Sequence, residues 1–313
     1  MKIAILSFYS GQVDRGVETW AKNLKEKLKD FDIEIISGKA EETYFTNVLR
    51  NIKRWAKTDI VVPTNGRSQV FVCRLVSWIT RRPMVVFGHS GPGADDKWNL
   101  LCSPNIFVAF SDSQKKWAES HRLPWTKVVK IPHAVDTKIF TPPLKKPRKK
   151  IVLCVAANSP DKRVDLVRSA AEMIGYKFVG VGKGSDKQVT HQKMPEVYKE
   201  ADVFCFVPQP WEAFGLVFLE AMASNLPIVT IDDPVRREIV GDAGIFVKDP
   251  TVGEELSYAI FDAYDKSWGD KPRKQAEKFS WDKVVKKYED LFATLQGASF
   301  KGHRVLENYK VLF

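Results

Sequence analysis

The sequence predicts an α/β protein made of two doubly wound domains whose sheets are mostly parallel. Three observations support this fold class. Short apolar, β-rich runs alternate with stretches of helical periodicity along the chain, which is the pattern of βαβ units. These runs fall into two series, separated by the proline-rich and basic stretch TPPLKKPRKK at 141–150. The length of 313 residues also allows two cores of about 150 residues each.

The first series predicts a domain over residues 1–143. Its six apolar runs are expected to be strands, at Lys2–Leu6, Ile33–Ile36, Ile60–Val62, Met84–Phe87, Ile106–Phe110 and Val128–Ile131. Apolar residues at helical spacing predict a helix between the first two strands, and these are Val17, Trp20, Leu24 and Leu28. Prolines and basic residues leave nothing to bury in 141–150, so this stretch is interpreted as the linker.

The second series predicts a domain over residues 144–290. Its strands are expected at Ile151–Ala156, Lys177–Val181, Val203–Val207, Ile228–Ile231 and Gly244–Val247, with helices at Val164–Ile174 and Glu254–Tyr264. The stretch FSWDKVVKKYEDLFATL then carries its apolar residues on one helical face. Residues 291–313 are expected to form a helical tail, and whether it packs back on the first domain stays open. Ligands are expected in a central cleft that the carboxyl ends of both sheets face.

Composition narrows the class of protein. A hydrophobic fraction of 44% with 12% aromatic residues is typical of globular domains. No apolar run approaches the ~20 residues of a spanning helix, and the opening MKIAILSFYSG is interpreted as a strand rather than a signal peptide. The cysteines form no CxxC pair, which favours reduced thiols and a cytoplasmic location over disulfides or zinc; they are Cys73, Cys102, Cys154 and Cys205.

The net charge of +11 is concentrated in the first half of the chain. Residues 1–150 hold 27 Lys and Arg against 14 Asp and Glu, whereas residues 151–313 hold 22 against 24. Such an asymmetry favours a polyanionic partner: nucleic acid, an anionic membrane face or a phosphorylated substrate. A merely solvated basic surface is the alternative.

The most informative segment is WEAFGLVFLEAMASNLPIVTI, at Trp211–Ile231. Residues Gly215 to Ser224 are predicted to form a helix that is apolar on every face, and such a helix is buried. Glu220 is its only charged residue. A buried carboxylate costs several kcal/mol unless it is paired, so Glu220 needs either an internal Arg or Lys partner or a ligand.

A second carboxylate, Glu212, favours the ligand. It lies in the loop at the amino end of the same helix, where backbone N–H groups and the helix dipole attract anions. Phosphates are expected at the N–H groups of Phe214 to Val217, and sugar hydroxyls at the two carboxylates. A nucleotide-sugar contains both parts.

The stretch EAFGLVFLEAMASNLPIV resembles the E-x7-E signature of the retaining GT-B glycosyltransferases of family 4. The resemblance implies the GT-B fold, with two Rossmann-like domains facing a cleft. It also implies that Glu212 contacts the donor sugar, that Glu220 binds the ribose hydroxyls, and that the backbone of three residues meets the diphosphate or sugar: Phe214, Gly215 and Leu216.

Other segments extend the resemblance over nearly the whole chain. RGVETWAKNL is similar to the family's Gly-Gly-Val-Glu loop, which implies that Gly16 approaches the donor phosphates. FGHSG resembles the segment whose histidine, here His89, faces the donor sugar. NSPDKRVDLV resembles the loop that supplies a lysine, here Lys162, to the phosphates.

Two departures from the family pattern are visible. The family's usual arginine falls at Ala157, and its Gly-Gly turn is replaced around Asp233–Arg237. Arg163 is our hypothesis for the missing charge, because a guanidinium binds phosphate bidentately. The glycine-rich FVGVGKGSD either lines the nucleotide pocket or is an ordinary turn. No second carboxylate pair or His accompanies Asp232 and Asp233 in the sequence, and no metal or other cofactor is expected.

The predicted activity is that of a retaining hexosyltransferase, which moves a sugar from a UDP-, GDP- or ADP-sugar to an acceptor hydroxyl. Lys162, Arg163, the helix end from Gly215 to Val217 and the Gly16 loop are expected to stabilise the leaving diphosphate. Glu212 and His89 are expected to orient the sugar. The expected acceptor is a glycan, a lipid-linked or phosphorylated molecule, or another small molecule. The basic first half favours peripheral contact with an anionic membrane over nucleic acid. A degenerate GT-B binding protein and a GT-B-type epimerase or phosphorylase remain the alternatives.

Overall fold

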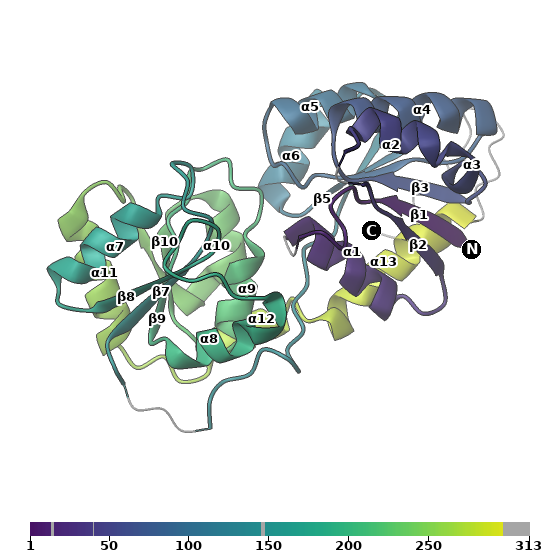
Figure 1. Cartoon of the computed structure of the whole chain (residues 1–313). Helices are drawn as coiled ribbons and strands as arrows, with labels where there is room; N and C mark the ends of the chain where they lie inside the picture. Colours follow the sequence, from purple (N-terminus) through teal and green to yellow (C-terminus); the bar gives the residue numbers. More distant parts are fainter. Residues whose placement is uncertain (14–15, 40, 145–147, 297–313) are drawn as a thin grey trace. The chain divides into compact units, whose positions relative to one another are not determined.

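The computed structural model describes residues 1–13, 16–39, 41–144 and 148–296 (Figure 1). These residues form two compact units. The first unit comprises Met1–Phe110, Gln114–Ile131 and the helical residues from Val285 onward. The second comprises Pro132–Val284 together with Ser111–Ser113. The change of unit therefore falls at Pro132, and the proline-rich stretch 141–150 belongs to the second unit. The tail residues 297–313 lie outside the described residues.

The first unit is a parallel α/β structure. Its strands are β1 Lys2–Leu6, β2 Asp32–Ile36, β3 Ile60–Pro63, β4 Val85–Phe87, β5 Ile106–Ala109 and β6 Lys127–Lys130. They pair in the orders β2-β1-β3 and β4-β5-β6, and a parallel bridge between Val61 and Met84 joins the two groups. The helices are α1 Gly16–Lys27, α2 Tyr44–Arg50, α3 Ile52–Trp55, α4 Arg67–Thr80, α5 Ala94–Leu101 and α6 Asp112–His121. The core contains alternate strand residues, such as Ala4 and Leu6, against inner residues of α4 such as Val70 and Cys73.

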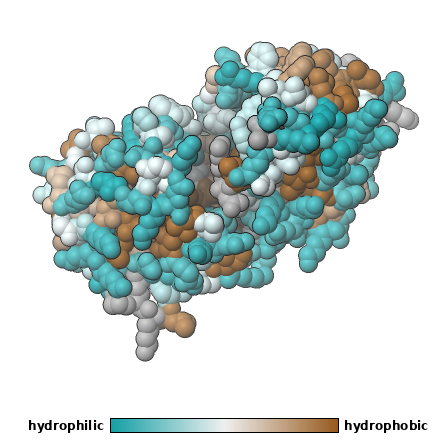
Figure 2. Space-filling view, viewed as in Figure 1, coloured by the Kyte–Doolittle hydropathy of each residue, from teal (hydrophilic) through white to brown (hydrophobic). Residues whose placement is uncertain are grey.

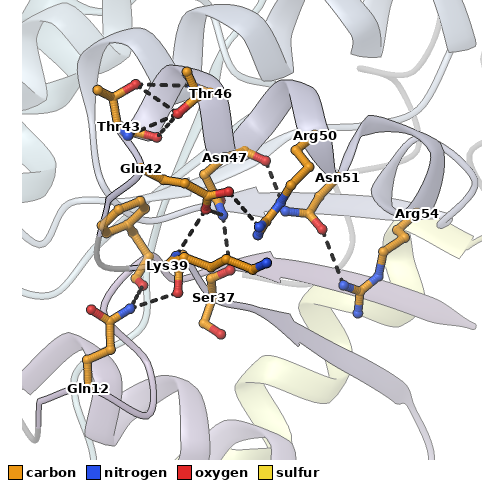
Figure 3. Close-up of polar contacts among 12 residues, drawn as sticks. Gln12, Ser37, Lys39, Glu42, Thr43, Thr46, Asn47, Arg50, Asn51 and Arg54 are labelled. Carbon is orange, nitrogen blue, oxygen red and sulfur yellow. Dashed lines mark hydrogen bonds and ion pairs between the residues drawn. The ribbon is translucent and has the colours of Figure 1, made fainter.

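Polar groups fix the connection from β2 to α2 (Figure 3). The buried Asn47 donates through Nδ2 to the carbonyl of Ser37, at 3.0 Å, and to Glu42, at 3.1 Å. Thr43 and Thr46 form a capping box at the start of α2. Such a box satisfies backbone donors that the first turn of a helix leaves without partners. These contacts therefore order the start of α2 and its connection to β2.

The second unit contains one five-stranded parallel sheet. Its strands are β7 Ile151–Val155, β8 Lys177–Val181, β9 Val203–Cys205, β10 Ile228–Ile231 and β11 Gly244–Val247, in the order β11-β10-β9-β7-β8. The helices are α7 Val164–Met173, α8 Met194–Glu200, α9 Leu216–Ala223, α10 Pro234–Val240, α11 Gly253–Asp265 and α12 Lys271–Glu277. The chain leaves β7 for β8 on one side and later returns to β9 on the other. The order thus reverses between β7 and β9, which is where doubly wound sheets bind ligands.

The predicted fold class is confirmed. All eleven expected strands occur, with ends within two residues of those predicted, and all their pairings are parallel. The amphipathic stretch after Phe279 is helix α13, Trp281–Gln296. The four cysteines are free thiols. Among the described residues, none of the helices combines the length and hydropathy needed to cross a membrane.

Candidate functional site

The carboxyl edge of the second sheet gathers most of the site residues that the sequence predicted. Lys162 lies in the loop after β7, and Glu212 lies in the loop after β9. Parallel strands end at the same edge of a sheet, and β7 and β9 are neighbours there. The two loops therefore meet at the point where the strand order reverses, although 50 residues separate them in the sequence.

Lys162 and Glu212 form the central contact. Nζ of Lys162 lies 2.5 Å from Oε2 of Glu212 and 3.4 Å from Oδ2 of Asp161. Burial by itself lowers the pKa of the ammonium, but the two carboxylates outweigh it and raise the pKa above its ordinary value. A lysine that is charged at neutral pH, beside an acceptor-only carboxylate, offers both a phosphate and a sugar-hydroxyl contact.

Arg163 lies next to this pair and ties the two loops together. Its backbone is in the left-handed region, with φ 53°, and its Nη2 donates to Oε1 of Gln209 at 2.7 Å. The backbone N–H of Gln209 in turn donates to the carbonyl of Asp161 at 2.9 Å. Arg163 forms no ion pair within the described ranges, so its charge is available at the edge of the sheet.

Sequence reasoning missed Arg236, which positions the Glu212 loop. It is fully buried on α10, and its guanidinium donates to the carbonyls of Glu212, at 2.7 Å, and Pro210, at 3.3 Å. Its counter-ion is Asp233, at 2.7 Å, which also caps α10. The sequence did contain a signal for this contact, because Asp233 and Arg236 are an acidic and a basic residue at i, i+3 spacing next to apolar residues. The segment that departs from the family's glycine turn thus holds a buried clamp.

Neither aspartate of the Asp232-Asp233 pair is free for a metal. Asp232 forms a two-bond ion pair with Arg237, at 2.7 and 2.8 Å, and Asp233 binds Arg236. In the part of the chain that the structure describes, no group of three or more His, Cys, Asp and Glu side chains is arranged to hold a metal ion.

The turn before α9 requires a glycine. Gly215 has φ +84°, and a Cβ atom there would lie 2.7 Å from the ring of Phe218. This turn starts the helix at Leu216, so the amides of Leu216 and Val217 lie in its first turn and have no intrahelical acceptor. Phe214 is buried against His133, with ring centroids 5.2 Å apart. The predicted phosphate-binding amides are therefore held on a rigid turn.

Glu220 has internal partners of a kind that we did not predict. Its side chain is on the buried helix α9, with 9% of the residue exposed. Oε2 accepts a hydrogen bond from the Tyr198 hydroxyl at 2.8 Å, and Oε1 lies 3.1 Å from Nε2 of His191. Burial, followed by the Glu220 charge, raises the pKa of Tyr198 well above its usual range, so the hydroxyl stays a donor. Each carboxylate oxygen has a second lone pair, which leaves acceptor capacity for a ribose hydroxyl.

The glycine-rich turn packs against the segment where the family arginine is missing. A Cβ atom on Gly182, which has φ +147°, would lie 2.1 Å from the carbonyl oxygen of Ala156. The N–H of Asn158 donates to the carbonyl of Lys183 at 2.8 Å. Close backbone packing against Ala156, next to the Ala157 position, is thus the structural reason for this glycine.

His89 and Gly16 belong to the first unit. His89 follows β4 and packs among aromatic rings, with centroid distances of 4.8 Å to Trp20 and 5.1 Å to Phe110. Trp20 is held by a 3.0 Å hydrogen bond from Nε1 to the hydroxyl of Tyr288 on α13. Burial lowers the pKa of His89 to about 3, so the imidazole is neutral near pH 7. Gly16 is the first residue of α1, and the two residues before it lie outside the described ranges.

Solved structures define the class of fold. Sucrose-phosphate synthase from Thermosynechococcus elongatus matches with a TM-score of 0.79 over 95% of this chain and 100% of its own, at 16% identity. HepE of Anabaena, solved in complex with UDP and glucose, matches with a TM-score of 0.74 over 94% and 99%, also at 16% identity. This likeness establishes the fold, which is the GT-B fold built from two Rossmann-like domains.

Sequence comparisons match part of the chain to known glycosyltransferases. A family model described as Glycosyl transferases group 1 matches residues 186–280. The O-antigen chain mannosyltransferase B of Escherichia coli is 35% identical over 30% of this chain and 26% of its own length. The lipopolysaccharide core biosynthesis mannosyltransferase LpsB of Rhizobium meliloti is 28% identical over 35% and 42%. The matches thus span less than half of either relative. Residues 186–280 therefore match the group 1 glycosyltransferases.

Proposed function

We propose that the chain transfers a hexose from a nucleoside-diphosphate sugar to an acceptor hydroxyl, with retention of the anomeric configuration. The observation that carries the proposal is the Lys162-Glu212 pair beside the first turn of α9, at the strand reversal of the second sheet. The family of the matched segment and the UDP and glucose complex of HepE support a nucleotide-sugar donor.

The proposed roles divide between charge stabilisation and orientation. Lys162, Arg163, and the backbone amides of Gly215 and of the first α9 residues Leu216 and Val217 would stabilise the charge that develops on the leaving diphosphate, together with the Gly16 loop of the first unit. Glu212 and His89 would orient the sugar, Phe214 would support the turn, and Glu220 would bind the ribose.

The Lys162-Glu212 contact gives these roles a physical basis. The two groups neutralise each other at 2.5 Å. A diphosphate beside Lys162 would add a second anion to the ammonium, while Glu212 would accept a sugar hydroxyl. Both contacts form without a large rearrangement, and preorganised charges of this kind stabilise a transition state most effectively. We propose that these cations suffice without a bound metal.

Donor binding and turnover test the proposal. A panel of UDP-, GDP- and ADP-sugars is titrated into the protein calorimetrically, and release of the nucleoside diphosphate is then followed with glycan acceptors, with and without EDTA. Lys162→Met is expected to lower kcat by about 100-fold, which is typical for loss of one preorganised donor. Lys274→Gln is the matched charge control, because that side chain is 70% exposed on α12.

Three outcomes count against parts of the proposal. Binding without turnover of any donor would favour the degenerate binding protein, and turnover of donor to its epimer would favour the epimerase. A product with inverted anomeric configuration, determined by NMR, would refute retention. Loss of turnover with EDTA would refute the metal-independent reading.

The acceptor that we propose is a lipid-linked or phosphorylated glycan, reached at an anionic membrane face. The excess of basic residues in the first half of the chain supports it. The names of the two mannosyltransferases, which concern O-antigen chains and lipopolysaccharide cores, also favour a glycan acceptor.

A further inference from the structure

Helix α4 carries apolar residues on two opposite faces. Its inner face is buried in the first unit through residues such as Val70 and Cys73. Its outer face has large apolar side chains at i, i+4, i+7 and i+8, and all are exposed, from 41% to 81%: Phe71, Leu75, Trp78 and Ile79. Figure 2 shows apolar side chains gathered over α4 along the upper edge of this unit. A continuous exposed apolar face of this kind marks an interaction surface.

A pocket opens within this apolar face. It has a volume of about 240 Å³ and is lined by α4, α5 and the Leu123–Trp125 segment. Three half-exposed tryptophans line it, one from each element: Trp78, Trp98 and Trp125. Tryptophan is the residue most characteristic of membrane-water interfaces, because its ring is largely apolar and its N–H is polar.

A buried cation lies in the wall of the pocket. Arg74 is 7% exposed, and its Nη1 donates to Oδ1 of Asn105 at 3.0 Å. Its Nε is buried with no hydrogen-bond partner, and its guanidinium carbon lies 4.9 Å from the centre of the Trp78 ring. Within the described ranges Arg74 forms no ion pair. Burial lowers its pKa to about 10, so the group is still charged at pH 7.

An uncompensated buried charge is costly, and an anion in the pocket would offset the cost. The hydroxyl of Ser103, which also lines the pocket, is buried without a partner and offers a further donor. An apolar peptide helix would cover the tryptophans and leave Arg74 unsatisfied. A free phosphate ion would satisfy Arg74 and leave the tryptophans exposed.

The surface around the pocket is basic. Arg81 lies at the end of α4, Lys97 on α5, and Arg122 just before the Leu123–Trp125 segment, and all three are exposed. None of them forms an ion pair in the described part of the first unit. An anionic bilayer surface attracts each such residue by about 1 kcal/mol.

We infer that this face binds an anionic membrane lipid. The lipid phosphate contacts Arg74, its hydrocarbon chains lie against Phe71, Leu75 and Trp98, and the basic rim meets neighbouring headgroups. This inference gives the proposed membrane association a site of its own, apart from the residues proposed for donor binding. It rests on no property of the transfer reaction, and donor affinity is measured separately, so either proposal can fail while the other holds.

Vesicle co-sedimentation tests the inference with the full chain. Vesicles of phosphatidylcholine alone are compared with vesicles that contain phosphatidylglycerol. The wild-type protein is expected to bind the anionic vesicles at least tenfold more tightly. Arg74→Gln is expected to weaken that binding about fivefold, the effect of one basic contact. Trp78→Ala with Trp125→Ala is expected to reduce binding to both vesicle types by about tenfold or more.

Matched variants keep the test independent of folding. Tyr258→Ala removes an aromatic side chain of 67% exposure from the second unit, and Lys274→Gln removes one exposed charge. Both are expected to bind vesicles as the wild type does. Arg74→Lys keeps the charge and is expected to restore most of the binding that Arg74→Gln loses. Circular dichroism and the thermal midpoint confirm that each variant is folded.

Three results would overturn the inference. Equal affinity for neutral and anionic vesicles excludes an anionic lipid. Unchanged binding by folded Arg74→Gln and by the double tryptophan variant excludes this pocket. Inhibition by 10 mM inorganic phosphate that exceeds the inhibition by sodium chloride at the same ionic strength makes a free phosphate the ligand instead.

Discussion

Arg236→Met removes the buried clamp of the Glu212 loop and keeps a side chain of similar length. Three groups lose their contact with the guanidinium: the carbonyls of Glu212 and Pro210, and the carboxylate of Asp233. The substitution therefore tests whether α10 positions the candidate donor site.

The expected loss of stability follows from these contacts. Breaking a buried ion pair by removing one partner costs about 3–5 kcal/mol, because the remaining charge is left uncompensated. Asp233 keeps the backbone bond from Arg236 N–H and is 14% exposed, which places the expected cost near the lower end. About 3 kcal/mol is a large part of the total stability of an ordinary domain, which is about 5–15 kcal/mol.

The assays are urea unfolding and donor titration. Arg236→Met is expected to lower the free energy of unfolding by about 3 kcal/mol and to raise the donor Kd by about tenfold or more, since the Glu212 loop loses two tethers. Asp233→Asn combined with Arg236→Met closes a double-mutant cycle and isolates the coupling between the two charges. Arg168→Met, which breaks the exposed pair with Asp186, is the matched control and is expected to cost at most about 1 kcal/mol.

A folded Arg236→Met protein with the wild-type urea midpoint would refute the clamp. A large loss of stability with unchanged donor affinity would leave the clamp as a fold element only and refute its positioning role. Arg236→Lys separates charge from geometry, because a lysine keeps the ion pair but cannot reach both carbonyls.

Three further predictions concern single groups. Gly215→Ala is expected to lower the free energy of unfolding by about 1–3 kcal/mol and to weaken donor binding, because φ is +84° and the new Cβ would meet Phe218. The control Gly269→Ala, where φ is +57° and the space is open, is expected to lower it less. Equal urea midpoints for the two variants would contradict this prediction. The folded-state pKa of Lys162 is raised, so its pairing with the carboxylates stabilises the fold fully below pH 10.5, the ordinary pKa of lysine. This stabilisation is lost as the pH rises through the folded-state pKa. The difference in unfolding free energy between wild type and Lys162→Met should therefore be constant from pH 6 to 9 and shrink above about pH 10.5. The pKa of His89 is lowered to about 3, so the NMR signals of its ring should not titrate between pH 5 and 8. Because His89 is protonated more readily in the unfolded chain, the free energy of unfolding should fall as the pH falls below 6.5. An NMR titration midpoint near pH 6.5 would refute the burial of the ring.

Much of the fold could be predicted because its causes are local. The run Ile228–Ile231 is β-branched and bounded by Pro227 and two aspartates, so strand β10 follows from its own residues. The positive φ at Gly215 likewise agrees with a glycine placed where a loop becomes a helix. The departures from the family pattern were visible in the sequence, but their structural consequence was not.

The sequence by itself determined the alternation of strands and helices, the apolar character of α9 and the presence of two carboxylates eight residues apart, because neighbouring residues decide these properties. Tertiary structure decided which distant groups meet. It brought Lys162 to Glu212, gave Glu220 a tyrosine and a histidine instead of an arginine or lysine, and placed Arg236 under the loop. Such contacts depend on strand order and on the packing of whole helices, and neither property is encoded in the spacing of residues along one segment.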